Sequence, residues 1–168
     1  MQGFKLIDPK EISENVFKMI GDEWFLITAG DENSFNSMTA SWGHMGFIWN
    51  KSTATCVIRP QRYTYGFIEK SDVYTLSFFG GGYRKELGFF GSKSGRDFDK
   101  PKETGLTPVF FDGVISYAEA ALVLVCKKLY TYDLKPENFL EKGIIDEFYN
   151  NDFHRAYIGE IVKTYKKL

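Results

Sequence analysis

The segment from Trp24 to Trp42 reads WFLITAGDENSFNSMTASW, and its pattern sets the structural class of the chain. Its first part is an extended-type run of aromatic and β-branched residues, and its middle, residues 30–34, has the turn-forming composition GDENS. A second extended run begins at Phe35. Two such runs joined by a short polar turn predict a β-hairpin.

Strand signals continue along the rest of the chain, whereas helical signals are short. The predicted further strands are residues 53–59, 73–79, 114–117, 121–132 and 155–164, and the predicted helices are 64–70, 83–90 and 136–149. Helices and strands do not alternate regularly, so a parallel βαβ sheet is disfavoured. A mainly β, closed antiparallel barrel with helical connections is the simplest prediction, because closure removes exposed strand edges.

The N-terminal region carries a helix-start signal. Asp8 is a candidate N-cap, Pro9 stands at the first helical position, and Glu11 completes a capping box. Apolar residues then recur at helical spacing, so we expect one helix that ends near Gly21.

Composition and charge exclude several classes of protein. The 168 residues fit one domain, spanning 1–168, and 43% hydrophobic with 17% aromatic content argues against disorder. With 22 acidic and 21 basic side chains, the net charge of -1 lacks the basic excess typical of nucleic-acid binding. Nucleic acid is therefore an unexpected partner.

The sequence also predicts a compartment. Its start has no apolar leader, and its longest apolar run, residues 120–126, is far shorter than the roughly 20 residues that cross a bilayer. Cys56 and Cys126 lie in strand-like apolar contexts, which favours buried thiols over a disulfide. We expect a cytoplasmic protein with no membrane association.

Residue inventory argues against several common active sites. Two histidines and two distant cysteines give no zinc-binding spacing, so we expect no metal site. The glycines at 80–82 lack the third glycine of a dinucleotide fingerprint, and residues 91–95 have Lys93 where a nucleophile elbow needs serine. No catalytic side-chain constellation is predicted.

Three polar clusters are candidates for holding a flat, anionic ligand. In residues 36–43, small side chains around Ala40 would let a ring approach the backbone, with Trp42 as a wall; an ordinary half-buried strand is the alternative. Residues 59–64 offer two arginines and a helix start for a phosphate, or a surface ion pair beside a helix cap. Residues 92–96 offer hydroxyls and cations, or a solvated loop.

His154 is the remaining candidate, as a proton donor or as a contact for a nicotinamide-type substrate. A capping or satisfied surface histidine is the alternative.

At these residues the sequence resembles the flavin reductase-like family of FMN-binding split barrels, a group that includes flavoredoxin. The similarity follows the chain in order and spans nearly all of it. The matching motifs are N-x-MTASWG at 36–43, WNK at 49–51, IRPQRYTY at 58–65, GSKSGRD-x-DK at 91–100, GLT at 105–107 and D-x-H-x-x-YIGEI at 152–161.

The resemblance implies a homodimer of Greek-key-like split barrels with short flanking helices, each binding one FMN non-covalently. It implies a ring-side group at residues 36–42 and a phosphate-side group in the other two clusters. The implied ring-side residues are Asn36, Met38, Thr39, Ala40, Ser41 and Trp42, and the implied phosphate-side residues are Arg59, Arg62, Tyr63, Thr64, Ser92, Lys93 and Ser94.

The activity that the resemblance implies is hydride transfer from NAD(P)H to FMN, with electrons passed on to an acceptor. Such chemistry requires no side-chain acid or nucleophile. A flavoredoxin-like electron carrier that uses a redox partner protein is the alternative, and a flavin-binding module without turnover is a third class.

Overall fold

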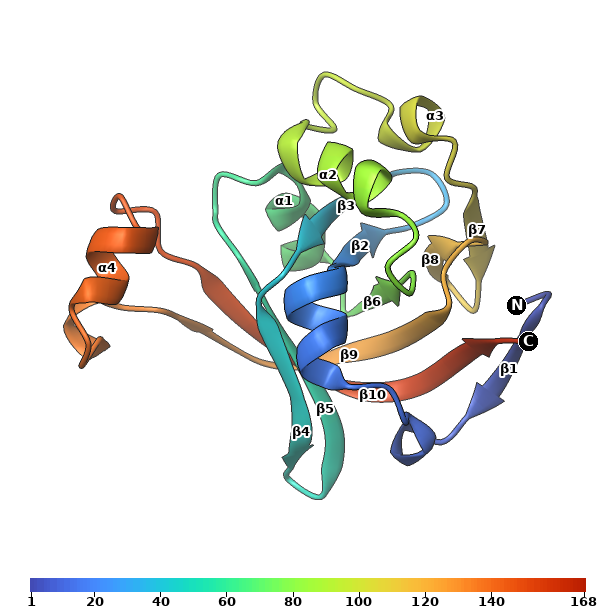
Figure 1. Cartoon of the computed structure of the whole chain (residues 1–168), viewed down its shortest axis with the longest axis horizontal. Coiled ribbons are helices and arrows are strands. Elements are labelled where there is room, and N and C mark those ends of the chain that lie inside the picture. The colour runs from blue at the N-terminus through green and yellow to red at the C-terminus, as the bar shows by residue number, and fades with distance from the viewer.

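The computed structural model describes residues 1–168, and its main feature is an eight-stranded antiparallel sheet that curls into a barrel (Figure 1). The strands are β1 (Phe4–Ile7), β2 (Phe25–Gly30), β3 (Phe35–Ala40), β4 (Gly43–Ile48), β5 (Lys51–Ile58), β6 (Val73–Phe78), β7 (Pro108–Phe111), β8 (Val114–Tyr117), β9 (Leu122–Asp133) and β10 (Arg155–Lys167). The helices are η1 (Pro9–Glu11), η2 (Lys18–Glu23), α1 (Tyr63–Lys70), α2 (Arg84–Ser92), α3 (Lys100–Thr104), η3 (Pro136–Asn138) and α4 (Gly143–Phe148).

The barrel is split rather than closed. The strand order is β3-β2-β6-β9-β10-β5-β4, with β1 pairing β10, so β3 and β4 are the two ends of the ladder. The chain passes between them through Ser41 and Trp42 and joins β5 at Gly43, where a Cβ would lie 2.4 Å from the Thr55 carbonyl oxygen. The strand pattern predicted closure, and this was wrong: the split form that the resemblance implied is the one present.

The predicted hairpin is confirmed. Strands β2 and β3 pair antiparallel from Phe25 opposite Ala40 to Gly30 opposite Phe35. Helices α1 and α2 both pack against β3 and lie on the same side of the barrel in Figure 1. The strand that carries the first polar cluster therefore lies beneath the two helices that flank the other clusters.

The N-terminal prediction was half correct. The capping box is present, because Asp8 N–H donates to Glu11 Oε1 at 2.9 Å and Lys10 N–H donates to Asp8 Oδ1 at 2.8 Å. However, it caps only the short η1. A second start signal interrupts the predicted helix: Asn15 Oδ1 accepts from Lys18 N–H at 3.1 Å and begins a separate helix that leads into η2.

The sequence analysis did not predict three of the strands, β1, β4 and β7. In β4, two glycines and a histidine weaken the local strand signal. Pairing with β5 creates this strand, through a two-residue turn in which Trp49 and Asn50 have φ angles of 53° and 56°. Positive φ at both positions is the geometry of a tight hairpin turn.

The core has two parts. The larger cluster fills the barrel interior, with Phe25, Leu76 and Tyr157 among its buried members, and the smaller lies between the barrel wall, α2 and β8. Cys56 and Cys126 are buried and unpaired, as predicted. No helix of the structure combines the length and apolar character that a bilayer crossing requires.

Strands β9 and β10 extend beyond the barrel and carry residues 134–154, a segment that we call the arm. It contains η3 and α4 and projects to the left in Figure 1. The arm closes at its base through Leu134 N–H, which donates to the His154 carbonyl at 2.9 Å. The single helix predicted for 136–149 is therefore two short helices joined by a loop.

Candidate functional site

Two adjoining cavities run along β3. The barrel-side cavity has a volume of about 230 Å³ and the loop-side cavity about 170 Å³, and Met38 and Arg62 line both. The barrel-side cavity is lined by Met38, Thr39, Ala40, Ser41, Trp42, Val57, Arg59, Arg62, Gly91 and His154. The loop-side cavity is lined by Asn36, Met38, Gln61, Arg62, Tyr63, Thr64, Ser92, Lys93, Ser94, Gly95, Arg96 and Lys100.

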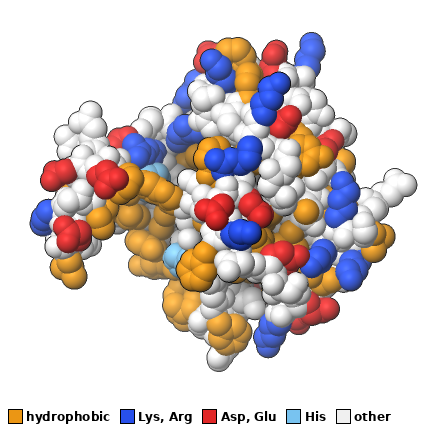
Figure 2. Space-filling view, viewed as in Figure 1, with side chains coloured by type: hydrophobic (Ala, Val, Ile, Leu, Met, Phe, Trp, Pro, Cys, Tyr) orange, Lys and Arg blue, Asp and Glu red, His pale blue; other side chains and the backbone are white.

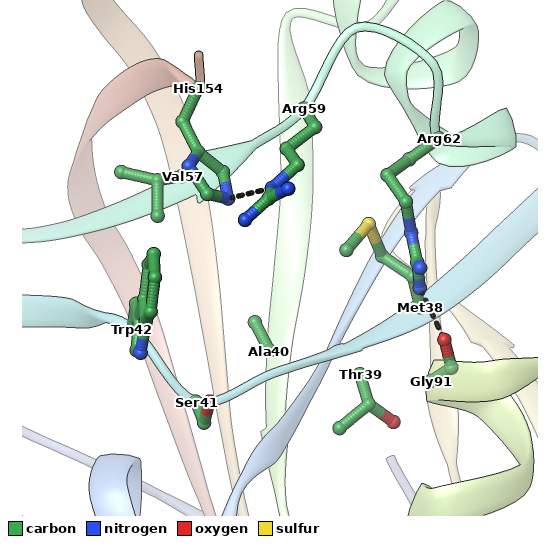
Figure 3. A pocket seen from close by; sticks show the side chains of 10 residues that line it. All are labelled: Met38, Thr39, Ala40, Ser41, Trp42, Val57, Arg59, Arg62, Gly91 and His154. Atoms are coloured by element: carbon green, nitrogen blue, oxygen red, sulfur yellow. Dashed lines mark hydrogen bonds between the residues drawn. The ribbon is translucent and has the colours of Figure 1, made fainter. Parts of the chain in front are cut away.

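Small residues form the floor of the barrel-side cavity. Figure 3 shows Thr39, Ala40 and Ser41 along the end of β3, with the two arginines on the opposite side. The Thr39 hydroxyl donates to the Leu87 carbonyl of α2 at 2.5 Å, so it is already engaged. What remains toward the cavity is a shallow surface of small side chains, which suits a planar ligand.

Gly95 allows the loop before α3 to pack closely against Asn36 and Tyr63 at the loop-side cavity. A Cβ on Gly95 would lie 2.0 Å from Asn36 Oδ1 and 3.2 Å from the Tyr63 ring. Asn36 is buried and donates through Nδ2 to the Thr64 hydroxyl at 2.7 Å. The loop before α3 is thus held against the end of β3 and the first turn of α1.

The loop-side cavity is strongly cationic. Four of its lining residues are basic, namely Arg62, Lys93, Arg96 and Lys100, and none is acidic. The start of α1, with Arg62 at its N-cap position, adds backbone N–H groups and the positive end of a helix. This donor set matches a phosphate group.

Arg62 and Lys100 also satisfy the C-terminal end of α2. Arg62 Nη2 donates to the Gly91 carbonyl at 2.8 Å, and Lys100 Nζ donates to the Phe90 carbonyl at 3.2 Å. Burial lowers the pKa of Arg62, and the positive charge of Arg59 lowers it further. The two cations thus bridge α2 to the rest of the cavity wall.

Arg59 occupies a different place from the other phosphate-side residues. It lines the barrel-side cavity, and its guanidinium is bound by the arm. It pairs with Asp152, donates to the Phe148 carbonyl at 2.8 Å, and contacts His154 Nε2 at 3.3 Å. For Arg59 the structure therefore favours the alternative of an ion pair beside a helix start. Its geometry does not support the prediction that Arg59 belongs with the phosphate-side residues.

His154 is held as a neutral ring. Burial lowers its pKa to about 4, and the Arg59 charge adds to the effect. Because Arg59 Nε donates to Nε2, the proton sits on Nδ1, which lies 3.1 Å from the Tyr149 hydroxyl. The Trp42 ring is 5.3 Å away. Both nitrogens have partners, so the geometry favours a positioning role over proton donation.

All fourteen candidate residues from the sequence line one cavity or the other. Six further lining residues were not named as candidates, although five of them lie within matched motifs and three of these five, Gln61, Gly95 and Arg96, lie within the predicted polar clusters. Val57 carries no local signal, because only the sheet brings it to the site. The missed residues are Val57, Gln61, Gly91, Gly95, Arg96 and Lys100.

Fold and site together define a split-barrel protein with a flat, small-residue surface beside a cationic cavity. Over residues 19–167 the sequence matches the family model for the flavin reductase like domain, and the chain belongs to this family. No match to a curated protein reaches significance.

Solved structures share the fold. An FMN-binding domain of a flavin reductases-like enzyme from Shewanella baltica superposes with a TM-score of 0.70 at 17% identity, covering 98% of this chain and 77% of that chain. An FMN-binding protein from Thermus thermophilus with bound p-hydroxybenzaldehyde superposes with a TM-score of 0.67 at 20% identity, covering 99% of this chain and 79% of that chain. Flavoredoxin from Methanosarcina acetivorans superposes with a TM-score of 0.68 at 19% identity, covering 96% of this chain and 76% of that chain.

Proposed function

We propose that this protein binds FMN non-covalently and is an oxidoreductase that takes hydride from NAD(P)H and passes electrons to an acceptor. The observation that carries the proposal is the pairing of two cavities: a cationic one without acidic residues, and a flat one of small residues directly beside it. Family membership supports it, as do the FMN-binding proteins that share the fold.

The residues present fit FMN. In the loop-side cavity, Arg62, Lys93 and the hydroxyls of Ser92, Ser94 and Thr64 supply donors for a phosphate. In the barrel-side cavity, the end of β3 supplies the small surface that a ring system requires. The two cavities adjoin at their shared lining residues, Met38 and Arg62, and we propose that one ligand spans both.

When bound, FMN supplies the hydride-accepting chemistry, and the protein supplies binding and orientation. Arg62 and Lys93 would hold the phosphate by charge-assisted hydrogen bonds. Ala40 and Ser41 allow close approach of the ring to β3. Trp42 lines the barrel-side cavity and is 38% exposed, and we propose that a second substrate approaches the ring beside it.

Anaerobic reduction tests the proposal. The purified protein, loaded with FMN, is mixed with NADH or NADPH without oxygen, and the flavin absorbance is followed. Bleaching with either nucleotide is the expected result. A protein that binds no FMN, or whose bound FMN stays oxidised with both nucleotides, contradicts it.

A flavoredoxin-like electron carrier is the second candidate. The arm projects from the barrel (Figure 1) and would provide a surface for a redox partner protein. The likeness to flavoredoxin supports the same idea. Stopped-flow reduction by a partner protein but not by NAD(P)H would select this function.

We also propose a homodimer. Several large apolar side chains are exposed on the β4–β5 turn and the neighbouring part of β9, among them Phe47, Trp49 and Tyr130, and the Trp49 and Tyr130 rings lie 6.2 Å apart. Figure 2 shows apolar side chains gathered between the arm and the barrel. Light scattering should give twice the chain mass, and Trp49→Ser should shift it toward the monomer.

The state of the two thiols supports a proposal for the cellular compartment of the protein. Cys56 and Cys126 are buried and unpaired. Free cysteines are typical of reducing compartments, and we propose a cytoplasmic location.

A further inference from the structure

Lys100 is the first residue of α3 and the most deeply buried cation of the loop-side cavity, with only 3% of its surface exposed. Its ammonium donates to the Ser37 carbonyl of β3 and to the Phe90 carbonyl of α2, and no carboxylate pairs with it. An ammonium has three N–H donors, so one is left without a protein acceptor. Buried charges usually have a charged partner, and this one has none within the chain.

The charged surroundings of Lys100 are mostly positive. Arg62 faces it from the start of α1, and Lys93 and Arg96 face the same cavity from the loop before α3. Asp99, the exposed N-cap of α3, accepts from Lys102 N–H at 3.3 Å. Tyr117 of β8 lines a neighbouring cavity with Lys100, and burial raises the pKa of its phenol.

We infer that Lys100 is a buried counter-charge for the phosphate of the ligand, and that its protonation is coupled to ligand binding. The inference rests on the proposed FMN function. It adds Lys100 to the residues that hold the phosphate and adds the uptake of a proton to the binding reaction. An anion in the loop-side cavity would supply the negative charge that Lys100 lacks, without requiring the ammonium to leave its two carbonyl partners.

The direction of the coupling follows from electrostatics. In the chain alone, burial lowers the pKa of Lys100 to about 8, and the Arg62 charge contributes to this. A bound dianion stabilises the ammonium form and raises that pKa, so binding above pH 8 takes up a proton from solvent. Phosphate affinity is therefore full below pH 8 and falls above it.

The size of the effect follows from the same value. One pH unit above its pKa a group is roughly nine-tenths deprotonated, so FMN affinity should be about tenfold weaker at pH 9 than at pH 7. Riboflavin, which has the same ring but no phosphate, should show no such loss. The phosphate itself stays dianionic across this range, since its second pKa is about 6.

The experiment compares FMN with riboflavin by fluorescence titration at pH 7 and pH 9. In the native protein the preference for FMN over riboflavin should fall about tenfold. In Lys100→Met the preference should be low and equal at both pH values. Lys102→Met, an exposed lysine on the same helix that lines neither cavity, should behave as the native protein.

Calorimetry measures the proton uptake on FMN binding in the native protein, so its result does not depend on whether a variant folds. FMN binding at pH 9 in two buffers of different ionisation enthalpy should show uptake of close to one proton, and riboflavin should show none. A preference that does not change with pH, or no proton uptake, overturns the role of Lys100 while leaving FMN binding intact. Failure to bind FMN at all overturns both.

Discussion

Replacing Gly95 with alanine tests whether the loop before α3 shapes the phosphate end of the site. The added Cβ would lie 2.0 Å from Asn36 Oδ1 and 3.0 Å from Asn36 Cγ, which is far inside van der Waals contact. Asn36 cannot turn away freely, because it is only 7% exposed and its Nδ2 bonds the Thr64 hydroxyl at 2.7 Å. Either that bond breaks or the loop moves outward.

Both outcomes have an estimable cost. Breaking a buried hydrogen bond and leaving one partner unsatisfied costs about 1–3 kcal/mol. Moving the loop instead displaces Ser94 and Lys93 from the loop-side cavity, and losing one charged hydrogen bond to a phosphate costs about 1.5–3 kcal/mol of binding. We therefore expect Gly95→Ala to weaken FMN binding by roughly tenfold to a hundredfold.

The assay is a fluorescence titration of FMN together with thermal unfolding of the ligand-free protein. Gly88→Ala is the matched control, because a Cβ there meets nothing within 4 Å and the residue lies within α2. Alanine in a helix interior should leave binding unchanged and stabilise the fold by up to about 1 kcal/mol. Native FMN affinity together with native thermal stability in Gly95→Ala would refute the argument that this loop is fixed by Asn36.

Further outcomes are expected for Lys93, Ala40 and His154. Lys93→Ala should weaken FMN binding by about 1.5–3 kcal/mol through loss of a charged phosphate contact; an unchanged titration would remove Lys93 from the site. Ala40→Leu should obstruct the barrel-side cavity of about 230 Å³ without unfolding the protein, so reconstitution should give an altered flavin spectrum, and a native spectrum would contradict the ring placement. The imidazole of His154 should titrate near pH 4 by NMR, and Arg59→Gln should raise its pKa because a neighbouring positive charge is removed. Since the folded-state pKa lies below the ordinary value near 6.5, stability should fall as pH drops from about 6.5 toward 4, and His154→Gln should flatten that part of the profile.

The hairpin and most other strands could be predicted from sequence because their signals are local. Residues 24–42 contain both extended runs and the turn between them, and pairing neighbours in sequence needs no distant information. Strand β4 could not be predicted in this way, since its glycines and histidine form a strand only against β5. The N-terminal helix was overextended because Asn15 starts a new helix inside an otherwise continuous apolar pattern.

The candidate site shows the same division. Residue types suited to phosphate were visible in the motifs around Arg62 and Lys93, and the structure places both at one cavity. The separation of Arg59 from that group was not visible, because it depends on Asp152 and the fold of an arm more than ninety residues away. A guanidinium in a sequence does not reveal which anion it will meet.

By itself the sequence determined the local properties of this protein: where most strands and turns lie, where basic and hydroxyl side chains cluster, and which family the chain resembles. The split barrel followed from the family resemblance and not from the strand pattern, and only the tertiary structure decided that Arg59 binds the arm and that Lys100 is buried without a carboxylate partner. Those features arise from contacts between residues distant in the chain, and burial, which sets the cost of a charge, exists only once the chain has folded.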